Sequence, residues 1–252
     1  MESLILKPGE QLDTLLNGRQ IIQNKEKFMF GIDAVLLSNF ASAKIRAQET
    51  VIDLGTGTGI IPLLLETSTK ASHFTALEVQ PESAEMAARS IATNKLENKI
   101  KVVEGNIKNV SELFKKHSFD VVTTNPPYMI NEHGRENIND AKTIARHEVL
   151  CNLEDIIAAA DYLLKPHGKF FMIHRPFRLP EITTQMKNHN LEPKRLRLIQ
   201  PSEGKEPNIM MIEGRKNANP RLKLEPTLNV YEKVGEYTQE VKDIYKSFQV
   251  NC

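Results

Sequence analysis

The amino-acid sequence predicts an α/β fold built on a doubly wound, mostly parallel sheet of seven strands. Three observations predict it. Short apolar runs alternate with segments of helical periodicity, polar side chains stand where several runs end, and a glycine-rich turn follows the first run. Ligands of such a sheet bind at the carboxyl ends of its strands, so those polar residues are the candidates for a site.

Each element has its own signal. The apolar runs predict strands at 51–54, 72–78, 99–103, 119–124, 169–174, 194–199 and 208–213. Between them, helical periodicity predicts helices at 60–65, 81–94, 111–116, 152–164 and 175–189. Pro81 suits a first helical turn, where a missing N–H is harmless, and Asn152 suits a helix cap.

Two shorter parts flank this sheet, which is expected to occupy residues 48–216. Residues 1–47 form a lead-in, with a small hairpin around Asn24-Lys25 and a helix from Gly31 to Ala41. The lead-in is expected to pack on the sheet rather than to form a separate domain. Residues 217–252 form a tail with an amphipathic segment near Val241–Phe248.

Composition sets broad limits on the class of protein. The chain is 40% hydrophobic and 26% charged, which is ordinary for a soluble globular protein. No run is long enough to span a membrane, and the first residues do not resemble a signal peptide. Cys151 and Cys252 show neither metal nor redox spacing, so we expect a cytoplasmic protein without a metal.

Charge is unevenly distributed along the chain. The formal net charge is +1, yet residues 165–223 hold 13 Lys and Arg against five Asp and Glu. A local excess of this size is typical of a region that follows phosphates, and equally of a basic solvated surface.

The glycine turn runs from Asp53 to Gly59, with Gly55, Gly57 and Gly59 in G-x-G-x-G spacing. Glycines let the backbone turn sharply and approach a ligand, and the next helix directs its N–H groups there. An ordinary tight βα turn is the alternative. Dinucleotide sites use G-x-G-x-x-G, and an acid at Asp53 suits a cationic ligand better than a pyrophosphate, which argues against a nicotinamide dehydrogenase.

Two further strand ends carry candidates. Glu78, about 20 residues past the glycines, can accept hydrogen bonds from two ribose hydroxyls. Asn106 can meet an adenine, although Glu104 is close enough in sequence to compete for that role.

Asn125-Pro126-Pro127-Tyr128 follows the fourth strand. An exocyclic amine on adenine is a poor nucleophile because its lone pair is delocalised. The Asn125 side-chain oxygen and the Pro126 carbonyl can accept its two N–H bonds and free that pair, while Tyr128 stacks on the base. Positioning and oriented dipoles then carry the reaction.

Together these motifs resemble class I S-adenosylmethionine-dependent methyltransferases (Rossmann-like) that modify planar nitrogens. Over almost the whole chain the sequence resembles the bacterial valine-tRNA adenine-N6 methyltransferase family. The segments that carry this resemblance are Phe28–Leu37, Asp53–Gly59, Asn125–Tyr128, Ala145–Glu148 and Ile173–Pro176 with Pro193–Arg197. The resemblance implies methyl transfer to N6 of the adenosine 3′ of the anticodon, with tRNA as partner and S-adenosylhomocysteine as product. A monomer is expected.

The resemblance also implies roles for residues. The cofactor residues are Phe30, Asp33, Asp53, Gly55, Gly57, Gly59, Glu78, Asn106 and Asn125, with Phe30 and Asp33 covering the cofactor from the lead-in. The family commonly has Asp at the position of Asn106 and Thr at that of Ile32. Candidate RNA contacts are Arg146, His147, Arg175, Arg195 and Arg197. His147 and Glu148 fit a general-base or metal role less well than orientation of the Asn125 loop or plain surface.

Three alternatives stay open at this point. The enzyme can modify guanine N2 in rRNA or glutamine N5 in a protein, because these relatives share the same motifs. The basic carboxyl half and the lack of a substrate-recognition domain before residue 40 disfavour glutamine. The third alternative is an RNA-binding protein that kept the fold without the catalysis.

Overall fold

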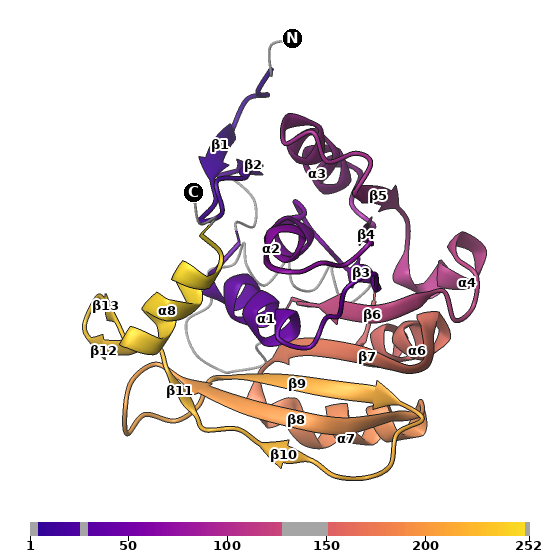
Figure 1. Ribbon diagram of the computed structural model, residues 1–252, viewed down its shortest axis with the longest axis vertical. Helices are drawn as coiled ribbons and strands as arrows, with labels where there is room; N and C mark the ends of the chain where they lie inside the picture. The colour runs from indigo at the N-terminus through magenta and orange to yellow at the C-terminus, as the bar shows by residue number, and fades with distance from the viewer. Residues whose placement is uncertain (1–4, 26–29, 128–150, 250–252) are drawn as a thin grey trace.

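A computed structural model describes residues 5–25, 30–127 and 151–249 of the chain. One large sheet organises these residues, in the strand order β10-β8-β9-β7-β6-β3-β4-β5, with β11 also pairing with β8 (Figure 1). Its strands are β3 (Thr50–Leu54), β4 (His73–Glu78), β5 (Ile100–Glu104), β6 (Phe119–Thr124), β7 (Leu164–His174), β8 (Leu191–Gln200), β9 (Ile209–Lys216), β10 (Lys223–Leu224) and β11 (Leu228–Asn229).

The strand directions confirm the predicted doubly wound, mostly parallel α/β fold. The five strands β5, β4, β3, β6 and β7 run parallel, whereas β9 runs antiparallel between β7 and β8. All seven predicted strands are present, and the two-residue strands β10 and β11 extend the sheet beyond β8. The chain moves from β3 outward to β5 and then returns to β6 on the other side. The carboxyl ends of β3 and β6 therefore flank the point where the strand order reverses.

Alternation along the strands divides the core into two layers. Val51 and Ile52 belong to opposite clusters, and so do Val121 and Val122. One cluster includes α1, α2 and α8, and the other includes α6 and α7, so both faces of the sheet are covered. The helices are α1 (Ile32–Ser42), α2 (Ile60–Ser68), α3 (Pro81–Thr93), α4 (Val110–Leu113), α6 (Leu153–Leu163), α7 (Leu179–Asn188) and α8 (Gln239–Ser247), with 3₁₀ turns η1 (Ile107–Asn109) and η2 (Pro176–Arg178).

Several boundaries differ from the prediction in the carboxyl half, among them β8, which begins at Leu191 instead of 194, and β9, which ends at Lys216 instead of 213. Strand β7 begins at Leu164 instead of 169, and its pairing with β6 is interrupted by a register shift. His167 has a φ of 64°, so the Lys-Pro-His-Gly segment forms an irregularity within the strand rather than a helix end. The helix predicted at 175–189 starts as η2 and becomes α7 at Leu179.

The lead-in contains a hairpin that the sequence did not predict. Strands β1 (Glu10–Thr14) and β2 (Gln20–Asn24) pair antiparallel with a turn at residues 15–19, whereas the second arm of the hairpin predicted around Asn24-Lys25 falls largely outside the described residues. Gly18 takes a φ of 75°, and its N–H donates to the carbonyl of Leu15 at 2.9 Å. The dipeptide Asn17-Gly18 is the usual hairpin signal, because both residues tolerate positive φ.

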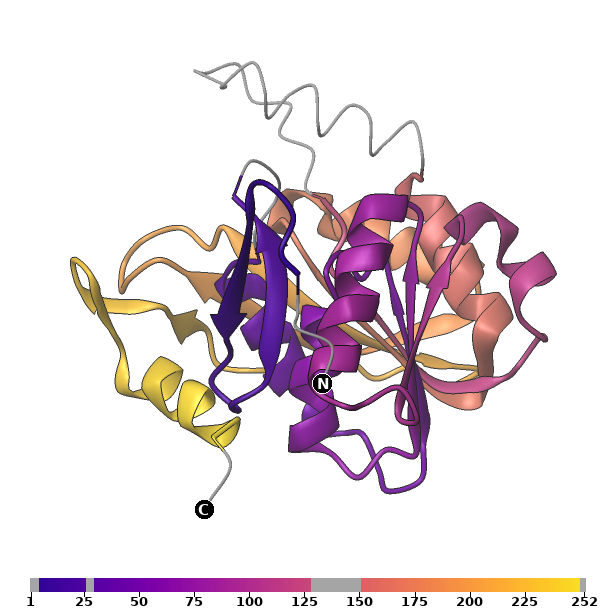
Figure 2. The same ribbon diagram turned by 90° about the horizontal axis from the view of Figure 1, so that it is seen from above.

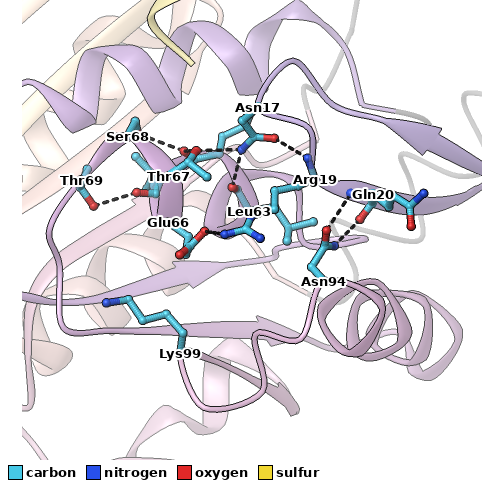
Figure 3. A network of polar contacts seen from close by, with 12 residues as sticks. Asn17, Arg19, Gln20, Leu63, Glu66, Thr67, Ser68, Thr69, Asn94 and Lys99 are labelled. Carbon is cyan, nitrogen blue, oxygen red and sulfur yellow. Dashed lines mark hydrogen bonds and ion pairs between the residues drawn. The ribbon is translucent and has the colours of Figure 1, made fainter. Parts of the chain in front are cut away.

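Polar side chains fix this hairpin beside α2 and α3 (Figures 2 and 3). Asn17 donates through Nδ2 to the carbonyl of Leu63 at 2.9 Å and to the hydroxyl of Thr67 at 2.8 Å. Arg19 pairs with Glu66 at 2.7 Å. Figure 2 shows the hairpin standing beside these helices, away from the sheet. The position of the lead-in is therefore set by specific hydrogen bonds as well as by packing.

Asn94→Ala is expected to lower the free energy of unfolding by about 1–3 kcal/mol, because two backbone groups of β2 lose their partner. Asn94 Oδ1 accepts from the N–H of Gln20 at 2.9 Å, and its Nδ2 donates to the carbonyl of Gln20 at 2.6 Å. Urea unfolding measures the change. Thr93→Ala is the control, since the Thr93 hydroxyl donates to the carbonyl of Arg89 within the same helix. An equal loss in both variants would contradict this role for Asn94.

Lead-in, sheet and tail share apolar contacts. Leu15 of the hairpin, Leu37 of α1 and Val241 of α8 lie in the same cluster as Val51 of β3. Figure 1 shows α8 beside α1 on one face of the sheet. The helix predicted near Val241–Phe248 is thus present as α8, while the division into three parts at 47 and 216 stays a prediction.

Candidate active site

The loop between β3 and α2 takes a conformation that requires glycine. Gly55, Gly57 and Gly59 have φ values of 70°, 59° and 87°. A Cβ added at Gly55 or Gly57 would meet no atom within 4 Å, whereas one at Gly59 would lie 3.4 Å from the Cβ of Ala87. The first two glycines therefore face open space, and the third allows α2 to approach α3. Close packing between helices explains the glycine at position 59 but not those at 55 and 57. An ordinary tight βα turn, in which glycines serve packing alone, therefore does not explain Gly55 and Gly57.

Asp53 lies in β3 just before this loop and is 1% exposed. Its Oδ1 accepts a hydrogen bond from the Thr123 hydroxyl at 2.7 Å, and Oδ2 has no hydrogen-bond partner among the described residues. The buried Thr56 hydroxyl lies near this carboxyl group but, within the same residues, also lacks a hydrogen bond. Burial, reinforced by the charge of Glu78, raises the pKa of Asp53 to about 7, although the Thr123 hydrogen bond opposes the rise. A neighbouring cation would favour the ionised form.

Glu78 ends β4 and is 5% exposed. Its Oε2 accepts from the N–H of Gly57 at 2.8 Å, and its Oε1 accepts from the N–H of Gln80 at 2.9 Å. This carboxylate therefore holds the glycine loop in place, a role that the sequence did not suggest. Each oxygen can accept a further hydrogen bond, so the predicted contact with ribose stays a prediction.

Asn106 follows β5 at the same edge of the sheet. Its Oδ1 accepts from the N–H of Lys108 at 2.9 Å and so caps η1. The contact with adenine predicted for Asn106 stays a prediction, and its amide nitrogen is the group suited to it, because Oδ1 already serves as the cap. Glu104 is exposed at the end of β5.

Asn125 follows β6 directly and is half-buried, while Pro126 is buried. Because Thr124 is level with Leu54 in the parallel pairing, Asn125 and Gly55 leave neighbouring strands at the same edge. The Thr124 hydroxyl donates to the carbonyl of Leu54 at 3.0 Å and ties the two strand ends together. The amide that the sequence singled out thus adjoins the glycine loop.

Thr123 is the site residue that sequence reasoning missed. It stands directly opposite Asp53 in the pairing of β3 and β6, 70 positions later in the chain. The available signal was its place two residues before Asn125, since alternate residues of a strand face the same side. The register between β3 and β6 is not given by the sequence, and without it Thr123 could not be placed opposite Asp53.

The other predicted site residues divide into two groups. Tyr128, Arg146 and His147, with neighbouring Glu148, lie outside the described residues. Phe30 donates its N–H to Oε1 of Gln23 at 3.0 Å and packs against the core cluster that contains α1. Asp33 lies in the first turn of α1. The roles of Phe30 and Asp33 in covering the cofactor stay predictions.

The predicted RNA-contacting arginines of β8 have partners within the protein. Arg195 pairs with Glu213 and Glu225, donates to the carbonyl of Phe40 at 2.8 Å and stacks over its ring. Arg197 donates to the carbonyl of Pro226 at 3.0 Å and pairs with Glu240 of α8. These contacts attach the tail to the sheet. They do not favour an RNA role, which stays untested for both residues.

A family model described as the methyltransferase small domain matches residues 32–190, well over half of the chain. The chain belongs to this family. The matched region contains the glycine loop, Glu78, Asn106 and Asn125.

Curated relatives extend the match beyond that domain. A tRNA1(Val) (adenine(37)-N6)-methyltransferase of Histophilus somni strain 129Pt is 30% identical, covering 92% of this chain and 94% of the relative. The enzyme of the same name from Porphyromonas gingivalis strain W83 is 28% identical, covering 86% and 87%. These matches confirm the predicted family of bacterial adenine-N6 tRNA methyltransferases and the predicted class of enzyme, an S-adenosylmethionine-dependent methyltransferase.

Solved structures agree on the fold. A predicted O-methyltransferase from Agrobacterium tumefaciens superposes with a TM-score of 0.69 at 22% identity, covering 87% of this chain and all of the other. A geranyl diphosphate C-methyltransferase from Streptomyces coelicolor, in complex with S-adenosylhomocysteine, gives 0.55 at 12% identity, covering 73% and 74%. At these identities the likeness is one of fold.

The methyltransferase site fits S-adenosylmethionine by its own chemistry. The glycine loop offers open space at Gly55 and Gly57, and the unpartnered Oδ2 of buried Asp53 suits a cationic group beside it. Within the described part of the chain, no three His, Cys, Asp or Glu residues gather as metal ligands. No helix there is long and apolar enough to cross a membrane.

Proposed function

We propose that this methyltransferase transfers a methyl group to the exocyclic N6 of an adenosine in tRNA. The observation that carries the proposal is the adjacency of Asn125 to the glycine loop at the switch point of the sheet. Methyl transfer requires the group that binds the substrate amine to lie beside the loop that holds the methyl donor. Asn125 and the glycine loop follow the neighbouring strands β6 and β3 at the same edge of the sheet.

The cofactor is assigned to the residues around that loop. Asp53 and Glu78 would bind its amino-acid end and its ribose, and Asn106 its adenine, with the backbone of the glycine loop in close contact. Phe30 and Asp33 would cover it from the lead-in of residues 1–47. When bound, S-adenosylmethionine supplies an electrophilic methyl group on a positively charged sulfur.

The substrate amine is assigned to the Asn-Pro-Pro-Tyr segment. Asn125 Oδ1 and the carbonyl of Pro126 would accept the two N–H bonds of N6 and localise its lone pair, while Tyr128 would stack on the base. The nitrogen then forms a bond to the methyl carbon as the carbon–sulfur bond breaks, its electron pair remaining on sulfur. The surplus proton leaves N6 for solvent after transfer, so a neutral amide suffices.

The names of the relatives support a specific target within tRNA. Two enzymes that match more than four-fifths of this chain carry names specifying adenine 37 of a valine tRNA. We therefore propose the adenosine 3′ of the anticodon of valine tRNA as the substrate. Arg146 and His147 are proposed to contact the RNA, and the enzyme is proposed to act as a monomer in the cytoplasm.

An assay on unmodified tRNA tests the proposal. The purified enzyme is incubated with labelled S-adenosylmethionine and an unmodified valine tRNA transcript, and the product nucleoside and its position are determined by mass spectrometry. We expect N6-methyladenosine at the position 3′ of the anticodon. Recovery of N2-methylguanosine, or of label in protein alone, would refute the substrate assignment.

A further inference from the structure

An exposed aromatic residue follows β7, the strand that pairs with β6 beside the candidate active site. Phe177 belongs to η2, the turn that follows β7, and its side chain is 64% exposed. Single exposed apolar residues are common on protein surfaces, so exposure by itself indicates nothing. The position of Phe177 and the residues around it are what distinguish it.

The position is fixed by the pairing of β6 with β7. Thr124 is level with Met172, so Asn125 is level with Ile173 at the edge of the sheet where the candidate site lies. Phe177 is four residues beyond Ile173, in the first turn after β7 ends at His174. The backbone of this turn therefore lies beyond the same edge of the sheet as Asn125.

The turn presents the ring rigidly. Pro176 fixes one backbone angle, and the N–H of Arg178 donates to the carbonyl of Arg175 at 3.2 Å. Arg178 pairs with Glu181 through two hydrogen bonds of 2.8 and 2.7 Å. A ring on such a turn loses little conformational freedom when a ligand stacks on it.

The surroundings of the ring suit a nucleic acid. Arg175, two residues before Phe177, donates through Nη1 to the carbonyl of Asn208 at 2.9 Å, which anchors its guanidinium beside the turn. An aromatic face beside a fixed guanidinium is the combination that binds an unpaired base and its phosphate.

We propose that Phe177 is a stacking platform for an unpaired base of the substrate RNA next to the target nucleotide, with Arg175 beside its phosphate. This inference rests on the proposed function, because it takes RNA as the substrate. Phe177 lies outside the Asn-Pro-Pro-Tyr segment. We therefore expect it to contribute to RNA binding rather than to the methyl-transfer step.

Steady-state methylation of an unmodified valine tRNA transcript tests the stacking. Phe177→Ala is expected to raise the KM for tRNA about tenfold with little change in kcat, because one stacked base is lost. Phe177→Tyr keeps a ring and is expected to stay close to wild type, whereas Phe177→Leu should behave like Phe177→Ala. Leu224→Ala is the matched control, since Leu224 is 69% exposed on β10 at the far edge of the sheet, and it should leave KM unchanged.

A second measurement separates base from phosphate. Arg175→Ala is expected to reduce the salt dependence of tRNA binding by about one phosphate contact, while Phe177→Ala leaves that slope unchanged. Affinity for S-adenosylmethionine, measured by calorimetry, should be unchanged in the Phe177 variants.

The outcomes separate this inference from the proposed function. If wild-type enzyme methylates the transcript and Phe177→Ala keeps its KM, the stacking inference fails and the function stands. A wild-type KM in Phe177→Leu would likewise overturn stacking, and so would an equal rise in Leu224→Ala. If the wild-type enzyme modifies no tRNA, the proposed function itself fails.

Discussion

Asn125→Ala is expected to lower turnover about 100- to 1,000-fold while changing the affinity for S-adenosylmethionine by less than about twofold. The substitution removes the side-chain oxygen proposed to accept a hydrogen bond from the adenine amine. The residues proposed to hold the cofactor, Asp53 and Glu78, lie on β3 and β4 and keep their own hydrogen bonds. Single-turnover methylation of tRNA measures the first effect, and calorimetry measures the second.

Two further variants control this result. Asn125→Asp keeps an acceptor oxygen at the same place and is expected to lose less activity than Asn125→Ala for that reason. Asn109→Ala removes the exposed asparagine that ends η1 and should match wild type in both measurements. If turnover and cofactor affinity fall together in Asn125→Ala, Asn125 acts in the cofactor site, the other role that the resemblance implied for it, and its assignment to the substrate is wrong.

The fold and the assembly of the site were predictable because their signals are local. Strands β3, β4 and β6 each contain a short apolar run, and Asp53, Glu78 and Asn125 stand at or next to their ends. In a parallel sheet all such ends meet at one edge, so the topology gathers them without any knowledge of side-chain contacts. Strand β6 was predicted with its observed bounds for this reason.

What the sequence did not reveal depends on pairing between distant segments. The pairing of β1 with β2 was not predicted, because it is not visible in the sequence of either strand alone. The contact of Thr123 with Asp53 likewise depends on the register between two strands.

Counting charges along the chain has the same weakness. Lys169 and Lys216 add to the basic balance of residues 165–223, yet Lys169 pairs with Glu49 and Lys216 with Asp161. Both acids lie outside that segment, so its apparent excess of positive charge is partly neutralised in the folded protein. The pairs of Arg195 with Glu225 and of Arg197 with Glu240 act in the same direction.

Asp53→Asn is expected to weaken the binding of S-adenosylmethionine about 10- to 100-fold, because the amide keeps the shape of the carboxyl but loses the charge that pairs with a cation. In the free wild-type enzyme the pKa of Asp53 is about 7, and a bound cation favours the ionised form. Cofactor binding should therefore strengthen as the pH rises from about 5.5 to 7 and release a proton in that range. Calorimetry in buffers of different ionisation enthalpy measures both effects, and Asp53→Asn should show neither.

The stability of the free enzyme should change in the opposite sense. A carboxyl with a folded pKa of about 7 and an unfolded value of 3.8 takes up a proton on folding between these limits. The stability it contributes is thus fully present below pH 3.8 and is lost as the pH rises to 7, by at most about 4 kcal/mol. At pH 8 free Asp53→Asn should unfold at a higher urea concentration than wild type, although it binds the cofactor more weakly. Thr123→Val removes a hydrogen bond that favours the ionised form, so it should raise the pKa of Asp53 and extend the loss to higher pH. A variant Asp53→Asn that is both less stable and unchanged in cofactor affinity would show that this carboxyl group is a structural element and not a binding group.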